Sequence, residues 1–139
     1  MNGEPAGDHG AKIKLSFELG KTYTRQQIQE RVGGGSVHNY LPNKDNKVLC
    51  ACLSQEYNPR APQVILVGQG LSVRHEAELF CGQLTAVPVF FKKVANFWEY
   101  VGNFKVLRWT DDPEEIADFE ESSGRANLTR VIFLEEDSV

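Results

Sequence analysis

The segment GGGSVHNYLP at residues 33–42 places three glycines before side chains that can hydrogen-bond or stack on a base. It does not fit a P-loop, which requires Lys-Ser or Lys-Thr after its last glycine, or a dinucleotide fingerprint, whose glycines lie between a strand and a helix. Two interpretations remain. The glycines either end a helix and turn the chain, or they let the backbone approach a ligand closely. In the second case the reading side chains are Ser36, His38, Asn39 and Tyr40.

A second candidate loop is EYNPRAP at residues 56–62. Prolines on both sides of Arg60 and Ala61 stiffen the loop, so Arg60 loses little backbone entropy on binding. Its guanidinium can contact a phosphate or a base edge, or it can simply lie in water. Tyr57 offers a ring on which a base can stack.

The third candidate is the aromatic stretch FFKKVANFWEYVGNFKVLRW at residues 90–109. Alternation puts Trp98 and Tyr100 on one face of a strand, where exposed rings can serve as stacking platforms. The alternative is that both rings fill the core of a half-buried strand. Lys92 and Lys93 face opposite sides of the chain, so at least one is expected to reach solvent and hold a phosphate.

Residues suited to catalysis or metal binding are sparse. Cys50, Cys52 and Cys81 have no disulfide or zinc spacing, and we expect them to be reduced, metal-free and, in the first two cases, small apolar fillers of a strand. The three histidines are far apart, and a Cys81–His38 pair is disfavoured because Cys81 falls on the expected buried face of its helix. No catalytic residue and no cofactor are predicted.

The net charge of −4 hides an uneven distribution. Residues 11–110 carry 13 Lys and Arg against 7 Asp and Glu, whereas residues 111–139 carry 2 against 10. A basic body fits an anionic partner on one face, although the two portions can also neutralise each other in the fold. No apolar run approaches the roughly 20 residues that span a bilayer, so no membrane partner is expected. The first residues lack the features of a secretory signal, which favours a cytoplasmic protein.

Capping residues at helix starts and glycines at helix ends predict three helices. The first, at 24–32, has Thr24 as N-cap with Gln27 as capping-box partner, and glycines end it. The second, at 72–82, is expected to be capped by Ser72. The third, at 113–121, has Asp112 as N-cap, Pro113 in its first position and Gly124 beyond its end.

Short runs rich in β-branched and aromatic residues predict strands. We expect a turn at Gly102-Asn103 between two of them. The predicted strands are 47–53, 63–68, 88–93, 97–101, 104–109 and 129–135. This order predicts an α+β fold, with a curved mixed sheet or small β-barrel flanked by about three helices. We expect a flexible lead at 1–10, a single domain at 11–135 and a short acidic tail at 136–139.

The order of YTRQQIQERVGGG, VLCACLSQEYNPRAPQVILVG, VPVFFKK, FWEYVGNFKV and RVIFLE resembles the SRA-like branch of the PUA-like superfamily, whose members accompany bacterial modification-dependent restriction endonucleases or occur alone. The resemblance covers residues 20–135. It implies a barrel-like sheet whose concave face and loops accept nucleic acid, often with a modified or flipped base. No nuclease motif is present, so any cleavage would belong to a nuclease or other protein partner.

The sequence therefore predicts a reader of a modified, flipped base in DNA. In this prediction Tyr40 or Tyr57 stacks on the base, His38, Asn39 and Ser36 read its edge, and Arg60, Lys92 and Lys93 hold phosphates. Two alternatives stay open. One is a protein-interaction module that uses the acidic helix 113–121, and the other is a small enzyme of unknown chemistry. A basic concave face rimmed by the loops 33–42 and 54–62 would favour the reader.

Overall fold

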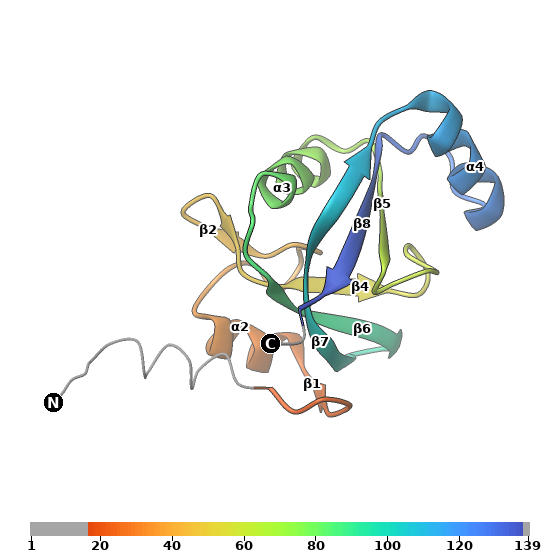
Figure 1. Cartoon of the computed structure of the whole chain (residues 1–139). Coiled ribbons are helices and arrows are strands. Elements are labelled where there is room, and N and C mark those ends of the chain that lie inside the picture. The colour runs from red at the N-terminus through yellow and green to blue at the C-terminus, as the bar shows by residue number, and fades with distance from the viewer. Residues whose placement is uncertain (1–16, 138–139) are drawn as a thin grey trace, which may run out of the picture.

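A computed structural model describes residues 17–137 and confirms the α+β class. In this part of the chain three helices accompany a mixed six-stranded sheet (Figure 1). The lead expected at 1–10 lies outside the described residues. The tail expected at 136–139 overlaps the last strand at Glu136, and residues 138–139 are also outside the described part. Among the described residues, no helix has the length and apolar character needed to cross a membrane.

The strands are β1 (Thr22–Tyr23), β2 (Asn43–Lys44), β3 (Lys47–Val48), β4 (Ala51–Ser54), β5 (Val64–Val67), β6 (Val87–Val94), β7 (Phe97–Thr110) and β8 (Arg130–Glu136). The main sheet has the order β4-β6-β7-β8-β5, and β1 pairs with β7. Among the described strands of this sheet, β4 and β6 are the one parallel pair, and the other pairs are antiparallel. The strands β2 and β3 form a separate hairpin.

The turn predicted at Gly102-Asn103 is wrong, because the predicted strands 97–101 and 104–109 are one continuous strand, β7. Val89 pairs with Gly102 and Phe90 pairs with Tyr100, so Val101 is the extra residue of a β-bulge. Gly102 has a φ of 127°, a conformation that glycine adopts readily. The glycine therefore serves a bulge inside the strand, and the reversal lies at Ala95-Asn96, where Asn96 has a φ of 65°.

The predicted strand 47–53 is also divided. It comprises β3 and β4, separated by Leu49 and Cys50. Asp45 and Asn46 both have positive φ, as a two-residue type I′ hairpin requires, and they return the chain from β2 into β3. The break frees β4 to pair with β6, which the hairpin strands do not do.

The helices are α2 (Arg25–Val32), α3 (Leu71–Cys81) and α4 (Pro113–Ser123). The capping box of Thr24 and Gln27 is confirmed, and Gly33 ends α2 in the left-handed conformation. The cap of Asp112 on α4 is confirmed as well. The cap predicted at Ser72 is wrong, because α3 begins one residue earlier and Gly70 occupies its N-cap position without a side-chain cap.

The sheet is not closed into a barrel, because β4 and β5 stand at its two ends. The larger core packs α3 against the sheet through residues such as Ala77, Phe80 and Ile132. A second core lies under α2, where Cys50 and Cys52 are 0% and 3% exposed and fill space between Ile28 and Phe90. These two cysteines are therefore small apolar fillers, as predicted; all three cysteines are free.

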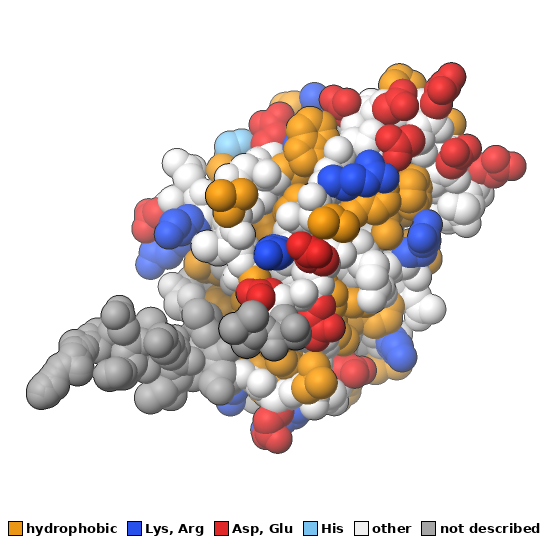
Figure 2. Space-filling model, viewed as in Figure 1, with side chains coloured by type: hydrophobic (Ala, Val, Ile, Leu, Met, Phe, Trp, Pro, Cys, Tyr) orange, Lys and Arg blue, Asp and Glu red, His pale blue; other side chains and the backbone are white. Residues whose placement is uncertain are grey.

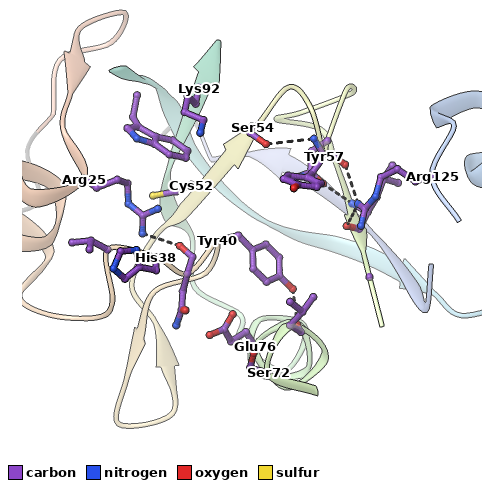
Figure 3. A pocket seen from close by; sticks show the side chains of 17 residues that line it. Arg25, His38, Tyr40, Cys52, Ser54, Tyr57, Ser72, Glu76, Lys92 and Arg125 are labelled. Atoms are coloured by element: carbon purple, nitrogen blue, oxygen red, sulfur yellow. Dashed lines mark hydrogen bonds between the residues drawn. The ribbon is translucent and has the colours of Figure 1, made fainter. Parts of the chain in front are cut away.

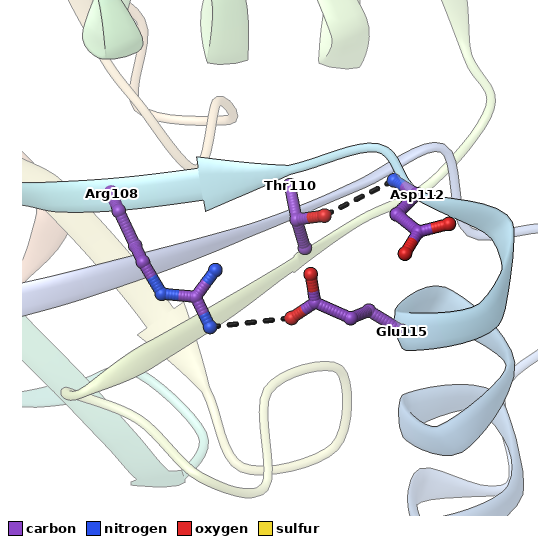
Figure 4. Close-up of polar contacts among 4 residues, drawn as sticks. All are labelled: Arg108, Thr110, Asp112 and Glu115. Atoms are coloured by element: carbon purple, nitrogen blue, oxygen red, sulfur yellow. Dashed lines mark hydrogen bonds and ion pairs between the residues drawn. The ribbon is translucent and has the colours of Figure 1, made fainter.

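Helix α4 lies at the far end of the molecule from α2, and acidic side chains gather over it (Figures 1 and 2). Arg108 of β7 forms an ion pair with Glu115 at 3.2 Å, next to the cap in which Thr110 Oγ1 accepts from Asp112 N (Figure 4). Lys105 pairs with Glu135 at 3.8 Å. The basic body and the acidic segment thus neutralise each other at these two exposed pairs.

Candidate functional site

A pocket of about 580 Å³ opens between the two edge strands of the sheet (Figure 3). Cys52 and Ser54 of β4 line one side, and Leu66 of β5 lines the other. Since β4 and β5 are the ends of the strand order, the sheet must curl enough to bring both edges to one cavity. The pocket occupies the place where a barrel would close.

Loop groups that line the pocket satisfy the free backbone groups of both edges. The carbonyl of Tyr40 accepts from Cys52 N at 2.8 Å on the β4 side. On the β5 side, Asn58 Oδ1 accepts from Leu66 N at 2.8 Å, and Arg125 donates to Leu66 O at 2.9 Å. These contacts replace the ladder that a neighbouring strand would supply. The fold therefore stabilises the opening between β4 and β5 without a strand that joins them.

Arg25, in the first turn of α2, fixes the loop 33–42. Its Nη2 donates to the carbonyl oxygens of Ser36 at 2.9 Å and Asn39 at 2.7 Å. The guanidinium also lies 5.1 Å from the centre of the Trp98 ring, a cation–π distance. A charged group thus holds the loop in place while it contributes to the pocket wall.

Tyr40 is anchored through its hydroxyl group. Its hydroxyl donates to Val73 O at 2.7 Å, which ties the loop to α3. Burial, first of all, raises the pKa of the phenol well above its usual range, with the Glu76 charge adding to the shift. Tyr40 is therefore a neutral residue of the pocket lining, and its hydroxyl group is fixed to α3.

Tyr57 presents the open aromatic surface of the site. The side chain is 57% exposed and lines the pocket. Arg125 lies 5.6 Å from the centre of its ring and donates to the carbonyl of Tyr57 at 2.9 Å. Desolvation lowers the pKa of Arg125. A guanidinium thus lies next to the ring, and more than half of the tyrosine remains exposed for contact with a ligand.

The pocket has an excess of positive charge. Arg25, Lys92 and Arg125 line it, and the described part of the chain offers none of them a carboxylate within ion-pair distance. The Lys92 ammonium lies 5.1 Å from the centre of the Trp98 ring. Uncompensated cations around a concavity favour an anionic ligand.

Glu76 of α3 is the acidic residue in the lining. It is 6% exposed, and within residues 17–137 its side chain has one hydrogen bond, a long one from Asn43 Nδ2 at 3.5 Å. Desolvation raises the pKa of this carboxyl, while the Asn43 contact and the neighbouring His75 oppose the shift. Figure 3 shows the carboxylate extending from α3 toward the loop that carries Tyr40.

Six of the ten predicted site residues come together in this pocket, from three separate stretches of the sequence. They are His38, Asn39, Tyr40, Tyr57, Lys92 and Trp98. The loops 33–42 and 54–62 both contribute to the wall. Trp98, however, is only 7% exposed and packs in the core under α2, so its ring is part of the wall and not an open platform.

The other four predicted site residues do not line the pocket. Ser36 accepts from His38 N and shapes the loop. The Arg60 guanidinium lies 5.3 Å from the Phe119 ring centre. Tyr100 packs at 5.6 Å from Phe90 and its hydroxyl donates to Asn103. Lys93 is exposed and lies outside the lining. It is the residue of β6 without a partner in β7, at a register shift between Lys92 and Val94 that interrupts the regular alternation of the strand.

The glycines of the loop 33–42 serve the chain itself. Gly33 ends α2, and Gly35, with a φ of 82°, packs against Pro42, since a Cβ there would come within 2.7 Å of Pro42 Cβ. None of the three lines the large pocket. The prediction that they bring the backbone close to a ligand is wrong for this pocket; they bring two parts of the loop together.

The sequence analysis missed Arg25, Glu76 and Arg125. Arg25 and Glu76 sit inside helical patterns, where a charged residue ordinarily faces solvent, and Arg125 follows a helix far along the chain. The sequence did contain one indication for Glu76. It shares the apolar side of its helix with Val73, Ala77 and Phe80. A charged residue among buried positions is a candidate for function.

No group of three or more His, Cys, Asp or Glu side chains in residues 17–137 is arranged to hold a metal ion. Comparison with curated proteins and with solved structures finds no match to the chain. A comparison with protein families does find one, and it covers residues 22–131, which include all of α2, α3 and α4 and every residue that lines the pocket. The chain belongs to the family described as Domain of unknown function (DUF6697).

Proposed function

We propose that this domain is a non-catalytic reader of nucleic acid, which takes a modified base, flipped out of DNA, into the pocket between β4 and β5. Two features around one cavity carry the proposal. Three cations have no ion-pair partner among the described residues, and one ring, Tyr57, is exposed. Cations hold phosphates, and a ring stacks on a base.

The size and lining of the pocket support a flipped base. Its volume of about 580 Å³ falls in the range of ligand sites, roughly 300–1,000 Å³. Apolar side chains of Val37, Leu66 and Val73 line it together with polar ones, and such a surface suits a base that carries a methyl-sized modification. Extruding a base costs a few kcal/mol, which stacking and edge contacts must offset.

The resemblance to SRA-like domains supports the same proposal, as does the basic concavity rimmed by the loops 33–42 and 54–62. The proposal includes a reducing, cytoplasmic setting, in which the free thiols of Cys50, Cys52 and Cys81 persist. A nuclease or other protein partner would supply any cleavage.

The test is binding of labelled oligonucleotides, with and without modified bases, by fluorescence anisotropy over a range of salt concentrations. We expect the logarithm of the affinity to fall linearly with the logarithm of the salt concentration. Lys92→Gln should weaken binding to every sequence alike and reduce the salt slope by about one. Tyr57→Ala should leave the slope unchanged and weaken binding by about 1–3 kcal/mol through lost stacking.

Lys93→Gln is the matched control, because Lys93 is the next residue of β6 and does not line the pocket. It should bind as the parent does. If Lys93→Gln weakens binding as much as Lys92→Gln, or if affinity does not depend on salt, phosphates are not held in this pocket and the proposal is wrong.

A further inference from the structure

Glu76 is a buried carboxylate that lines the pocket and lacks a good hydrogen-bond partner within the described protein. It is 94% buried, and its one contact, from Asn43 Nδ2, is 3.5 Å long. The same Asn43 nitrogen donates to Leu41 O at 2.9 Å, so the shorter bond goes to the backbone. Buried charged oxygens are ordinarily satisfied by several donors.

A ligand is the natural source of the missing donors. A carboxylate has two oxygens that only accept, and it pairs best with two parallel N–H groups. Among the nucleic-acid bases, guanine alone carries two adjacent donors on its Watson–Crick edge, N1–H and the N2 amino group. Adenine and cytosine each place a ring-nitrogen acceptor beside a single amino group, and thymine places its one N–H between two carbonyls. Acceptors opposite a carboxylate repel it.

We propose that Glu76 makes the pocket selective for guanine-type bases, with its two oxygens accepting from N1–H and the N2 amino group. This inference rests on the proposed function. It assigns a direction to the bound base, with the Watson–Crick edge at α3 and the sugar-phosphate toward Lys92 and Arg25, which lie away from Glu76 in Figure 3.

An arginine side chain of a peptide also carries two parallel donors. The charges of the pocket disfavour it, because Arg25, Lys92 and Arg125 line the cavity and repel another guanidinium. A guanine base is neutral, and the phosphates beside it are attracted by the same three cations. The lining therefore favours the nucleotide over the peptide.

The test uses DNA duplexes that are identical except for one unpaired base, G, A, C, T or hypoxanthine, placed opposite an abasic site. We expect the G duplex to bind about tenfold or more tightly than the A, C and T duplexes. Hypoxanthine keeps N1–H and lacks the amino group, so its duplex should bind between these limits. Glu76→Gln replaces one acceptor by a donor and should remove the preference for G while binding to the other duplexes changes less than threefold.

Glu78→Gln is the control, since Glu78 is exposed on the same helix and does not line the pocket. It should retain the preference. If the duplexes bind with salt-dependent affinity but without preference for G, or if Glu76→Gln keeps the preference, the guanine inference is wrong and the reader proposal stands. If no duplex binds, the guanine inference is wrong, and the modified oligonucleotides of the first test decide the reader proposal separately. If a peptide with a single arginine binds in place of every oligonucleotide, both are wrong.

Discussion

Arg25 shows at the scale of one residue how the pocket depends on a planar charged group. One nitrogen of its guanidinium donates to two carbonyls of the loop 33–42, and the plane lies near the Trp98 ring. A lysine keeps the charge but loses the fixed, planar arrangement of donors. The structure of the loop thus depends on this arginine beyond its charge.

Arg25→Lys should therefore destabilise the protein by about 1–3 kcal/mol, since hydrogen bonds from charged groups are strong. Chemical denaturation measures the loss. Arg74→Lys is the control, because Arg74 is exposed on α3 and its side chain has no hydrogen bond to the described residues. Equal stability of the two variants would show that the Arg25 contacts do not hold the loop.

Glu76 makes a second prediction at this scale, about pH. Burial raises the pKa of its carboxyl above the ordinary value of 4.5, so the folded protein keeps this proton to higher pH than the unfolded chain does. In the window above pH 4.5 the folded state binds more protons, and this group's contribution to the free energy of unfolding falls as pH rises. The ionised form of Glu76 thus lowers the free energy of unfolding at neutral pH.

Glu76→Gln removes that titration. The melting temperature of Glu76→Gln relative to the parent should therefore rise as the pH increases from 4 toward 7. Thermal melts at a series of pH values measure it, and Glu78→Gln, which replaces an exposed carboxylate of the same helix, is measured alongside as the control. A difference for Glu76→Gln that is constant, or that falls with pH, contradicts a raised pKa.

At the scale of elements, local signals were sufficient where a short pattern has one structural outcome. Thr24 with Gln27, and Asp112 with Pro113, predicted the starts of α2 and α4 correctly because a capping residue bonds only to its own first turn. The helix α3 begins at Leu71, and its N-cap residue, Gly70, has no side chain to cap it, so the nearest capping residue, Ser72, misled the prediction. Gly102 also misled the prediction of a turn, because a glycine with positive φ occurs in β-bulges as well as in turns.

Substitution of Gly102 tests how strongly the β-bulge constrains β7. A Cβ there would come within 3.1 Å of Glu136 Oε2 and 3.3 Å of Phe104 Cε1, and the φ of 127° is strained for any other residue. Gly102→Ala should cost about 2–3 kcal/mol of stability. Gly124→Ala, at a φ of 75° with open space around it, should cost about 1 kcal/mol.

Equilibrium unfolding of the two alanine variants compares these costs. Losses of the same size would mean that the neighbours of Gly102 move aside freely and that the bulge does not constrain β7. A larger loss for Gly102→Ala would support the continuous strand, which carries the pairing with both β6 and β8.

At the scale of the whole molecule, the sequence predicted the class of fold and the loops but not the gap in the sheet. The strand order β4-β6-β7-β8-β5 depends on pairings between segments far apart in the chain, and no local pattern encodes them. Arg125 reaches the pocket only because α4 and the segment after it return to the edge of β5. Long-range contacts thus decide which predicted residues meet, as the separation of Arg60 from Lys92 illustrates.

The same arrangement provides an internal probe of the central claim, that the pocket binds nucleic acid. The chain has two tryptophans, Trp98 in the pocket wall and Trp109 on β7 outside the lining. In Trp109→Phe, Trp98 is the remaining tryptophan, and its emission reports on the pocket. Anisotropy of a labelled oligonucleotide reports on binding anywhere on the protein.

Both signals should be followed in one titration of Trp109→Phe with an oligonucleotide that the parent binds. We predict that the Trp98 emission changes with the same midpoint as the anisotropy, and that raising the salt concentration shifts both midpoints together. An anisotropy increase to saturation with unchanged Trp98 emission would place the nucleic acid elsewhere on the protein and contradict the account.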